Sequence, residues 1–556
     1  MHPYPIDHIL PELKKAVLGG PAVVLQAPPG SGKTTRVPLA LLEAMSSEQG
    51  RIIMLEPRRI AAVAAARWMA RLLGEPVGKT IGYTIRFDRR ISKNTRLEVV
   101  TEGILTRRLI DDPSLEGVVM IIFDEFHERS LQADLVLALS LDIQRSLRED
   151  LKLLVMSATI ETAPIAALLG GAPVITASGE TFPVTEHFLP EGGWSRGQGE
   201  AWKDRIVAAV RTALRDTTGD ILIFLPGAGE IRQAAASLQD VITGWEKPIS
   251  LHLLYGDLPF AEQERAIMPG AQRKIVLATN IAETSLTIEG VRVVIDGGQG
   301  RRLQYDPATG MNRLLTVTIS RASSIQRQGR AGRLGPGTCY RLYSRHVYDS
   351  MIPYAPPEIL TSDLSSLVLE LATWGVTDPS ALAWLDPPPQ GAWEGARRLL
   401  MDLDALNQNG TATPMGQAMA RLPLHPRLGR MLLRAADSGH LRLGADLAAL
   451  LSERDIMRRN EQDRRGGADI SERLSMLQRW RKEKEAPPGT DPWALQSVER
   501  AAEQLWKLAA TAAVEVACKN KSDAISSLLL RAYSDRIAHR RAEGGDRYLL
   551  AQGRGV

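Results

Sequence analysis

The sequence has little cysteine and no long apolar run, and each shortage excludes a class of protein. Cys339 and Cys518 are the only cysteines among 556 residues. This excludes a disulfide framework or a thiolate zinc cluster and favours a reducing compartment. No stretch of about eighteen uninterrupted apolar residues occurs, and the N-terminus lacks a basic segment followed by an apolar one. We therefore expect a cytoplasmic protein with no membrane partner.

The sequence also has little excess charge. Its 68 Lys and Arg against 64 Asp and Glu give a formal net charge of +4. This permits a nucleic-acid partner without requiring one, because the placement of charge matters more than its sum. The hydrophobic share of 44% and the charged share of 24% are ordinary for a folded protein. The length exceeds what one core can hold, so about three to five domains are expected.

A glycine-rich loop between a short apolar run and a helical pattern predicts a nucleotide site. The run covers residues 22–26 and the helical pattern covers residues 33–45. Backbone N–H groups of such a loop converge on phosphate oxygens where no side chain blocks the approach. A surface loop that carries Gly-Lys-Thr by chance is the alternative, which the flanking strand and helix disfavour. The candidate nucleotide-binding residues are Pro29, Gly30, Ser31, Gly32, Lys33, Thr34 and Thr35.

Strand-length apolar runs alternate with helical patterns along the first 350 residues or so. Such alternation predicts an α/β fold with a parallel, doubly wound sheet and its ligand at the carboxyl ends of the strands. Gly-Lys-Thr is absent from the second half of the series, so we expect a second lobe that closes over the nucleotide bound by the first. The predicted strands are 51–56, 97–100, 118–123 and 151–156, then 220–227, 250–255, 274–279 and 291–295.

Two adjacent carboxylates follow the most apolar of these strands, in Asp124-Glu125-Phe126-His127. Lys33 is placed to reach the β- and γ-phosphates, and Thr34, Asp124 and Glu125 are candidate ligands of Mg²⁺. Glu125 would also orient and deprotonate the attacking water. Solvated acids at a strand end are the alternative, but two such acids beside a phosphate loop repel unless a cation lies between them. His127 taken alone is more typical of packing or capping.

Three shorter pieces also end strands. Glu56-Pro57-Arg58-Arg59 and Thr101-Glu102-Gly103 offer groups suited to a sugar-phosphate chain, although each alone is a common loop end. The hydroxyls of Ser157-Ala158-Thr159 would link the magnesium carboxylates to the second lobe.

The second lobe offers Gln326, Arg330 and Arg333 in a basic run. Arg330 and Arg333 are spaced to share one helix face. Two guanidinium groups aimed together stabilise charge on a transferring phosphoryl group, and Gln326 would orient the water. The alternative is a solvated or RNA-facing run, which we favour for Arg327 and Arg321.

Taken together, these motifs resemble the DEAH-box helicases of superfamily 2, most closely the bacterial HrpB-type branch. Their order and spacing are similar to the family's across residues 20–345, with Phe126 where the family motif has Ala. The matching stretches are Ala-Pro-Pro-Gly-Ser-Gly-Lys-Thr, Glu-Pro-Arg-Arg, Thr-Glu-Gly, Asp-Glu-Phe-His, Ser-Ala-Thr, Phe-Leu-Pro-Gly, Ala-Thr-Asn-Ile-Ala-Glu-Thr-Ser-Leu-Thr-Ile and Gln-Arg-Gln-Gly-Arg-Ala-Gly-Arg.

The resemblance implies two RecA-like lobes with ATP and Mg²⁺ between them and a nucleic-acid strand across both. Other nucleoside triphosphates are expected to serve, since no adenine-reading loop is evident. A β-hairpin at 297–320 would separate strands, and His127, Ser157 and Thr159 would couple nucleotide to strand. The implied nucleic-acid contacts are Arg58, Arg59, Thr101, Gly227, Thr279, Thr284 and Thr287.

The resemblance also implies an order of domains. The last is expected to be incomplete, so that the chain would end inside it; alternatively, residues 548–550 pair with another sheet. The expected domains are RecA-like lobe 1 at 1–180, lobe 2 at 181–352, a winged helix at 353–424, a helical bundle or ratchet at 425–522 and the start of an OB-like domain at 523–556.

We therefore expect an ATP-dependent helicase or translocase, monomeric, acting on single-stranded RNA, with DNA as a further substrate, in the 3′ to 5′ direction. Protein partners are not specified by the sequence. The alternative is an ATP-switched RNA clamp or ribonucleoprotein remodelling factor that does not unwind processively. An ordinary P-loop GTPase or transport ATPase is disfavoured, since it would not need the arginine pair and no Asn-Lys-x-Asp guanine reader occurs.

Overall fold

The protein is described here by a computed structural model, which forms two compact units. The first unit comprises Met1–Ser362 with Leu382–Pro387, and the second comprises Asp363–Ala381 with Pro388–Val556. The boundaries of the five domains expected from the sequence stay a prediction, because this division into two units is coarser. The described residues are 4–28, 30–45, 50–86, 88–158, 162–177, 182–190, 201–256, 258–283, 288–306, 309–333, 335–458, 469–510, 521–541, 547–551, 553 and 555.

The first lobe of the first unit is an eight-stranded sheet in the order β4-β3-β5-β2-β6-β7-β1-β8, parallel except for β4. β6 lies between two parallel neighbours and reads Val-Val-Met-Ile-Ile-Phe, as a strand buried on both faces requires. The strands are β1 (Ala22–Gln26), β2 (Arg51–Leu55), β3 (Ile81–Ile85), β4 (Asp88–Arg90), β5 (Leu97–Val100), β6 (Val118–Phe123), β7 (Lys152–Ser157) and β8 (Val174–Thr176).

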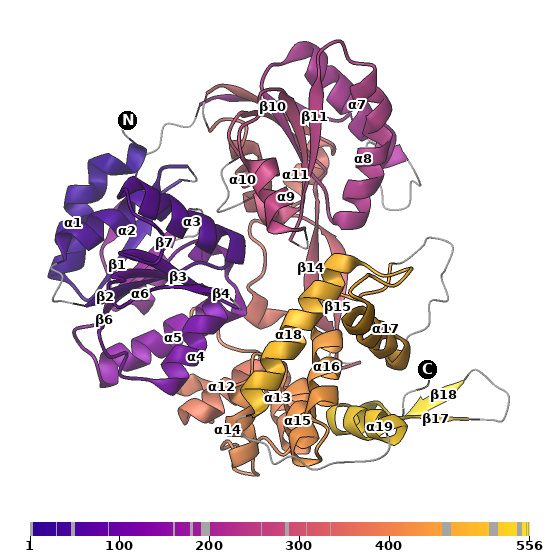
Figure 1. Ribbon diagram of the computed structural model, residues 1–556. Helices are drawn as coiled ribbons and strands as arrows, with labels where there is room; N and C mark the ends of the chain where they lie inside the picture. The colour runs from indigo at the N-terminus through magenta and orange to yellow at the C-terminus, as the bar shows by residue number, and fades with distance from the viewer. Residues whose placement is uncertain are drawn as a thin grey trace. The chain divides into compact units, whose positions relative to one another are not determined.

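Helices cover both faces of this sheet. Apolar side chains of α1, α2 and α3 share one core with the strands, and α4 and α5 lie on the other face (Figure 1). The carboxyl ends of β1, β2, β5, β6 and β7 lead directly into the loops that carry the predicted site. The helices are η1 (Pro5–Ile9), α1 (Leu10–Gly19), α2 (Lys33–Ala44), α3 (Arg59–Leu72), α4 (Glu102–Asp111), η2 (Phe126–Glu128), α5 (Leu131–Ser146) and α6 (Thr162–Leu168).

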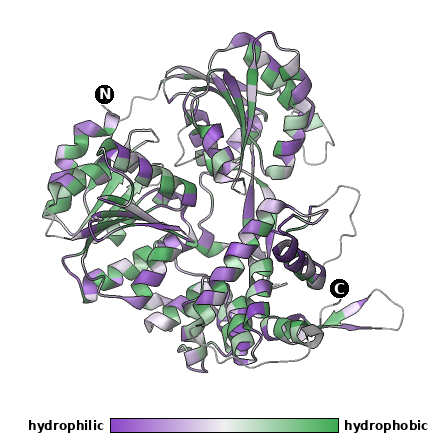
Figure 2. Ribbon diagram, in the orientation of Figure 1, coloured by the Kyte–Doolittle hydropathy of each residue, from purple (hydrophilic) through white to green (hydrophobic). Residues whose placement is uncertain are grey.

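The second lobe is a six-stranded sheet in the order β11-β12-β10-β13-β16-β9, with every neighbouring pair parallel. The central strands of both sheets are strongly apolar (Figure 2). The strands are β9 (Val184–Phe188), β10 (Asp220–Phe224), β11 (Ile249–Leu254), β12 (Arg273–Ala278), β13 (Val291–Asp296) and β16 (Gly337–Arg341). Its helices are α7 (Ala201–Asp216), α8 (Ala228–Thr243), α9 (Phe260–Ile267), η3 (Asn280–Ala282), α10 (Arg321–Gly329), α11 (Arg345–Asp349) and η4 (Glu358–Leu360).

The hairpin predicted at 297–320 is confirmed. β14 (Gln299–Asp306) and β15 (Met311–Thr318) pair antiparallel, from Gln299 opposite Thr318 to Asp306 opposite Met311. Leu303, Leu314 and Leu315 are exposed on it.

The second unit is mainly helical. Within the region expected to form the wing, Leu406 and Ala412 make an isolated antiparallel bridge. Tyr548–Leu550 pairs antiparallel with Ala538–Arg540 in a separate two-stranded sheet, so it does not join one of the larger sheets, and the start of an OB-like domain at 523–556 stays a prediction. The elements are α12 (Ser365–Trp374), η5 (Pro379–Ala381), α13 (Gln390–Asp402), α14 (Pro414–Ala420), α15 (Pro426–Asp437), α16 (Leu441–Ser452), α17 (Ile470–Glu483), α18 (Pro492–Ala510), α19 (Lys521–Ala532), η6 (Ser534–Arg536), β17 (Ala538–Arg540) and β18 (Tyr548–Leu550).

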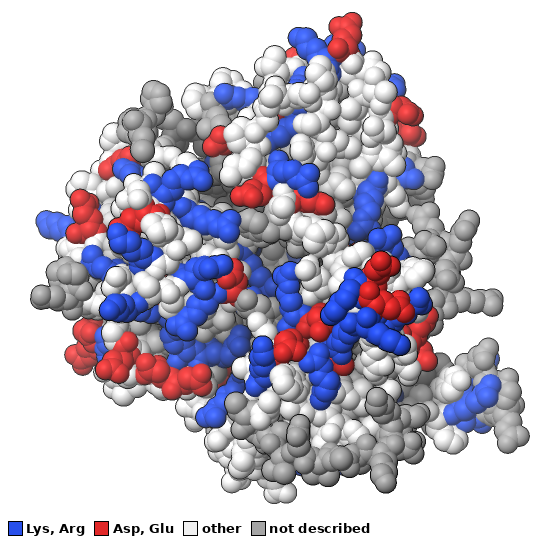
Figure 3. Space-filling view, viewed as in Figure 1, with Lys and Arg blue, Asp and Glu red and all other residues white. Residues whose placement is uncertain are grey.

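Two observations bear on the classes of protein excluded above. In the part of the chain that the structure describes, no helix is long and apolar enough to cross a bilayer. Basic and acidic side chains are interspersed on the face shown in Figure 3, as the small net charge suggests.

Candidate nucleotide site and nucleic-acid interface

The loop between β1 and α2 has the backbone that a phosphate cradle needs. Gly30 has φ 86° and Gly32 has φ 94°, both in the left-handed region that glycine adopts without strain. Gly32 is the N-cap of α2, so the amides of the first helical turn and the positive end of the helix face the loop. The described part of the predicted loop therefore adopts the expected anion-binding form; Pro29 lies outside the described residues.

Lys33 and the two carboxylates after β6 form one buried charge cluster. Lys33 Nζ lies 3.0 Å from Glu125 Oε1, with both side chains about 5% exposed or less. Burial raises the pKa of Asp124 to about 6, a shift that Lys33 opposes and Glu125 reinforces. Burial also disfavours ionised Glu125, but the attraction of Lys33 prevails and holds the pKa of Glu125 at about 2. Glu125 is thus ionised at neutral pH, as a residue that orients water requires.

The backbone at Glu125 is strained. Its φ of 49° places a non-glycine residue in the left-handed region, and the turn is closed by a hydrogen bond from Glu128 N to Glu125 O of 2.9 Å. Strain of this kind persists only where the surrounding contacts fix it, and it concentrates at functional sites. Phe126, in the position where the family has Ala, is buried and packs edge-on against Phe123.

His127 links this turn to the Ser-Ala-Thr segment. Its Nδ1 accepts a 3.4 Å hydrogen bond from Ala158 N and lies 3.3 Å from Glu125 Oε2. Burial lowers the pKa of His127, which favours the neutral ring. An Nδ1 that accepts from Ala158 leaves the proton on Nε2. Ser157 ends β7 and is fully buried, whereas Thr159 lies outside the described residues.

The arginines of the second lobe lie at the phosphate loop. A Cβ placed on Gly30 would come within 2.7 Å of Arg333 Nε, so only a bare glycine permits this approach. Arg330 is buried, donates from Nε to the Glu283 carbonyl at 3.0 Å, and lies close enough to Glu125 for attraction to affect both pKa values. Burial and the neighbouring Arg333 lower the pKa of Arg330 to about 9. Gln326, also buried, lines the adjoining cavity.

Several buried polar atoms at this site have no hydrogen-bond partner among the described residues. They include Ser31 Oγ in the loop, Asp124 Oδ2 after β6 and Arg333 Nη1 from the second lobe. A hydroxyl and a guanidinium would satisfy phosphate oxygens, and a carboxylate oxygen would satisfy a hydrated cation. The hydroxyl of Thr34 acts to lower the pKa of Asp124, as a group close to this carboxylate would. The residues present therefore fit Mg²⁺ and a nucleoside triphosphate.

The described residues among those expected to touch nucleic acid lie in loops at the carboxyl ends of strands in the two sheets. Arg58 pairs with Glu128 at 2.9 Å and donates to the Asn280 carbonyl at 2.9 Å, next to Thr279. Arg59 is exposed at the start of α3, and Thr101 is the N-cap of α4. Gly227 is the N-cap of α8, where a Cβ would meet Arg301. Thr284 and Thr287 lie outside the described residues.

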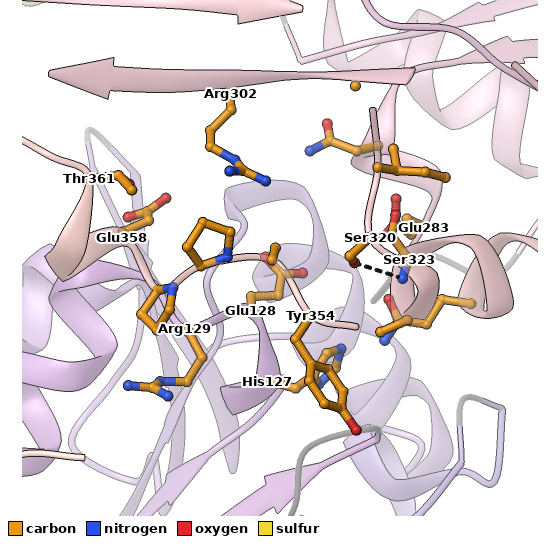
Figure 4. Close-up of a pocket in the computed structure, with 18 of the residues that line it drawn as sticks. His127, Glu128, Arg129, Glu283, Arg302, Ser320, Ser323, Tyr354, Glu358 and Thr361 are labelled. Atoms are coloured by element: carbon orange, nitrogen blue, oxygen red, sulfur yellow. Dashed lines mark hydrogen bonds between the residues drawn. The ribbon is translucent and has the colours of Figure 1, made fainter. Parts of the chain in front are cut away.

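A cavity of about 700 Å³ lies beside these loops. Figure 4 shows His127, Glu128 and Arg129 of the first lobe around it, with Arg302, Ser320 and Ser323 of the second. Buried His127 Nε2 has no hydrogen-bond partner in the part of the chain that the structure describes. The cavity thus joins the turn that carries Glu125 to the base of the β14–β15 hairpin.

One interpretation from the sequence is wrong. Arg327 was expected to face solvent or RNA, but it is 1% exposed and pairs with Asp296 at 2.8 Å and Glu283 at 3.1 Å. The sequence analysis also missed Arg129, whose side chain pairs with both Asp134 and Asp386. Its position just after the carboxylate motif was the only available signal, since Asp386 follows 257 residues later.

Comparison with known proteins adds three family matches. The DEAD/DEAH box helicase family matches residues 11–168, and the helicase conserved C-terminal domain matches residues 204–335. The winged-helix part of the helicase associated domain (HA2) matches residues 396–424, inside the region predicted as a winged helix.

Two curated relatives and a solved structure are similar over long stretches. The chain is 43% identical over 558 residues to ATP-dependent RNA helicase HrpB of Escherichia coli, covering 100% of this chain and 64% of that protein. It is 38% identical over 434 residues to ATP-dependent RNA helicase HrpA of Borreliella burgdorferi, covering 78% and 52%. The crystal structure of the Escherichia coli DEAH/RHA helicase HrpB has a TM-score of 0.84 at 42% identity, covering 99% of this chain and 66% of that one. The chain thus spans less than two thirds of the length of these curated relatives.

Proposed function

We propose, from the premise that this chain belongs to the DEAH-box helicases of the HrpB type, that it is an ATP-dependent RNA helicase. The observation that carries the proposal is the approach of Arg333 from the second lobe to Gly30 of the phosphate loop. A triphosphate held by that loop would be contacted from both lobes. Hydrolysis would then change how tightly the lobes are held together, which is what a strand-moving ATPase requires.

The chain's own residues divide the work at the nucleotide. Lys33 and the amides of residues 30–33 bind the phosphates, and Thr34 with Asp124 would hold Mg²⁺, which neutralises phosphate charge when bound. Glu125, already ionised, takes the proton of the attacking water, and Gln326 helps to orient that water. Arg330 and Arg333 stabilise the charge that develops on the transferred phosphoryl group. Other nucleoside triphosphates should also serve, since none of these contacts involves the base.

We propose further that single-stranded RNA is held by Arg58, Arg59, Thr101, Gly227, Thr279, Thr284 and Thr287 and advanced 3′ to 5′. The contacts of Arg58 support this proposal. An RNA phosphate that displaced Glu128 from Arg58 would also disturb the hydrogen bond from Arg58 to the Asn280 carbonyl in the second lobe. His127, Ser157 and Thr159 would couple the strand to the nucleotide. The protein would act as a monomer in the cytoplasm, and DNA is a further candidate strand.

Strand displacement tests the proposed function. An RNA duplex with a 3′ overhang should be unwound in the presence of Mg²⁺ and ATP, and one with a 5′ overhang should be unwound far more slowly. RNA-stimulated hydrolysis without displacement of either duplex would favour an ATP-switched RNA clamp or remodelling factor. Equal stimulation by DNA would remove the preference for RNA.

A further inference from the structure

A short loop of the first unit is bounded on both sides by chain of the second. Residues Leu382–Pro387 belong to the first unit, whereas Asp363–Ala381 and Pro388–Val556 belong to the second. A carboxylate oxygen of Asp386 in this loop accepts a 2.6 Å hydrogen bond from Arg129 Nη2. The first lobe therefore holds a piece of chain that continues into the second unit at both ends.

The guanidinium of Arg129 binds two carboxylates through Nε and Nη2. Besides Asp386, it makes a two-pronged pair with Asp134, from Nε and Nη2, with both distances 3.0 Å. Its Cζ lies 5.9 Å from the centroid of the Phe126 ring, and the side chain is 11% exposed. Such a planar, forked and partly buried ion pair fixes orientation as well as charge, which a lysine at the same place would not do.

A second segment near the unit boundary, at Glu358, hydrogen-bonds to the backbone on either side of Ser130. Glu358 N donates to Arg129 O at 3.0 Å, and Leu131 N donates to Glu358 Oε2 at 3.0 Å. Figure 4 shows Glu358 and Arg129 at one side of the cavity. Glu358 lies four positions before Ser362, the last residue before the chain first leaves the first unit. Asp386 and Glu358, which we call the anchors of Arg129, thus both lie in segments next to a position where the chain passes from the first unit to the second.

The turn that Arg129 closes is the one that carries Glu125. Arg129 N donates to Phe126 O at 3.1 Å, and Glu128 N donates to Glu125 O at 2.9 Å. Glu125 and Arg129 both have left-handed backbones, with φ of 49° and 50°. Neither residue favours this conformation, so side-chain contacts must hold the turn. Those contacts are Lys33 and His127 at one end and Asp134, Asp386 and Glu358 at the other.

We propose that Arg129 is a positioning residue for hydrolysis, which fixes the carboxylate of Glu125 through the shared turn and makes that position depend on the anchors Asp386 and Glu358. Movement of either anchoring segment would reach Glu125 through a turn of five residues. This inference rests on the proposed function, and it assigns the role to residues that the motif analysis did not select.

The test separates chemistry from nucleotide binding. Arg129→Gln should lower the RNA-stimulated kcat by about 10- to 100-fold, the scale of a 1 Å misplacement of a reacting group. The KM for ATP and the affinity for a fluorescent ATP analogue should stay within about 2-fold, because the phosphate loop is untouched. Arg129→Lys keeps the charge but loses the forked guanidinium, so its kcat should lie between those of the wild type and Arg129→Gln. Asp386→Asn should lower kcat more mildly, since the pair with Asp134 remains.

A control and a double variant decide the outcome. Asp455→Asn removes a comparable two-pronged pair with Arg473, in the second unit, and should leave kcat unchanged. Asp386→Asn should add nothing to Arg129→Gln, because the two act through one contact. The inference is overturned if Arg129→Gln, folded by its Tm, keeps the wild-type kcat, or if the Asp386 effect persists undiminished in that background. A wild-type chain without ATPase activity overturns the proposed function and the inference with it.

Discussion

Lys33 and Glu125 lie 92 residues apart in the sequence and form a buried ion pair, with Nζ 3.0 Å from Oε1. Removing either partner of such a pair leaves a charge uncompensated in a site of low polarity. The pair also keeps Glu125 ionised, because the attraction of Lys33 outweighs the effect of burial on the pKa. Lys33 of the phosphate loop therefore keeps Glu125, the proposed base for the attacking water, in its ionised form even without a nucleotide.

Glu125→Gln should leave nucleotide binding intact and lower turnover by about 10²- to 10⁴-fold, the usual contribution of a general base. The amide keeps a hydrogen-bond acceptor for Lys33 but cannot take a proton from water. Single-turnover hydrolysis and titration of a fluorescent ATP analogue measure the two effects. Glu116→Gln, an exposed change in the same lobe, is the control. Unchanged turnover would remove Glu125 from the mechanism.

Arg333→Ala should lower kcat by about 10³-fold or more, the scale found for arginines that stabilise a transferring phosphoryl group. Nucleotide should still bind, because Lys33 and the loop amides are unchanged. Arg345→Ala, on the exposed helix α11 of the same lobe, should have no such effect. A loss confined to nucleotide affinity, with kcat retained, would contradict the assignment.

Gly30→Ala should weaken both nucleotide binding and hydrolysis. A Cβ there would come within 2.7 Å of Arg333 Nε, and the backbone φ of 86° adds strain. Gly74→Ala is a matched control, since Gly74 has φ 69° but no atom of the described residues within 4 Å of its added Cβ. Gly74→Ala should lower the free energy of unfolding by about 1 kcal/mol and leave nucleotide binding and hydrolysis unchanged. Equal kinetic effects in the two variants would show that strain, not the approach of Arg333, matters at Gly30.

The partly buried carboxyl of Glu102 should make stability depend on pH. Burial raises its pKa to about 8; the carboxylates of Glu128, Glu358 and Asp134 act in the same direction, while a hydrogen bond from Ser130 opposes them. In the unfolded chain Glu102 loses its proton near pH 4.5, whereas the folded protein retains it to about pH 8. The unfolded state thus binds fewer protons in this window, so the contribution of Glu102 to stability falls as pH rises through it.

Glu102→Gln copies the neutral form and cannot ionise. Its Tm should approach or match that of the wild type near pH 5 and exceed it near pH 8.5 by about 5 °C, given ~1.4 kcal/mol for each unit of pKa shift. Calorimetry across this range measures the difference, with Glu116→Gln as the exposed control. A Tm difference that does not change with pH would contradict the buried neutral carboxyl.

Much of the first unit could be predicted because its strands are continuous apolar runs with polar ends. Residues 97–100 and 118–123 match β5 and β6, and most other predicted strands differ by a residue or so at an end. β16 was not predicted, since it includes Arg341, a buried arginine that lies over the Phe188 and Tyr348 rings. Its carboxylate partner Glu186 lies 155 residues away in the sequence, so the sequence around Arg341 gives no signal that this charge is buried.

Local sequence patterns also decided which residues of the candidate site could be predicted. Lys33, Asp124 and Glu125 follow strands in recognisable patterns, so their meeting could be expected from the sheet topology. Arg327 was misjudged because Asp296 and Glu283, which neutralise it, are 31 and 44 residues away. Arg129 was missed because its partner Asp386 lies beyond the second lobe, in a loop that no periodicity connects to the first.

The most direct test of the account is the steady-state rate of ATP hydrolysis by the wild-type chain and by Arg333→Ala, each with and without single-stranded RNA. The account predicts that RNA stimulates the wild type and that Arg333→Ala loses the stimulated rate while it still binds nucleotide. Full RNA-stimulated hydrolysis by Arg333→Ala would contradict the claim that the second lobe completes the site of the first.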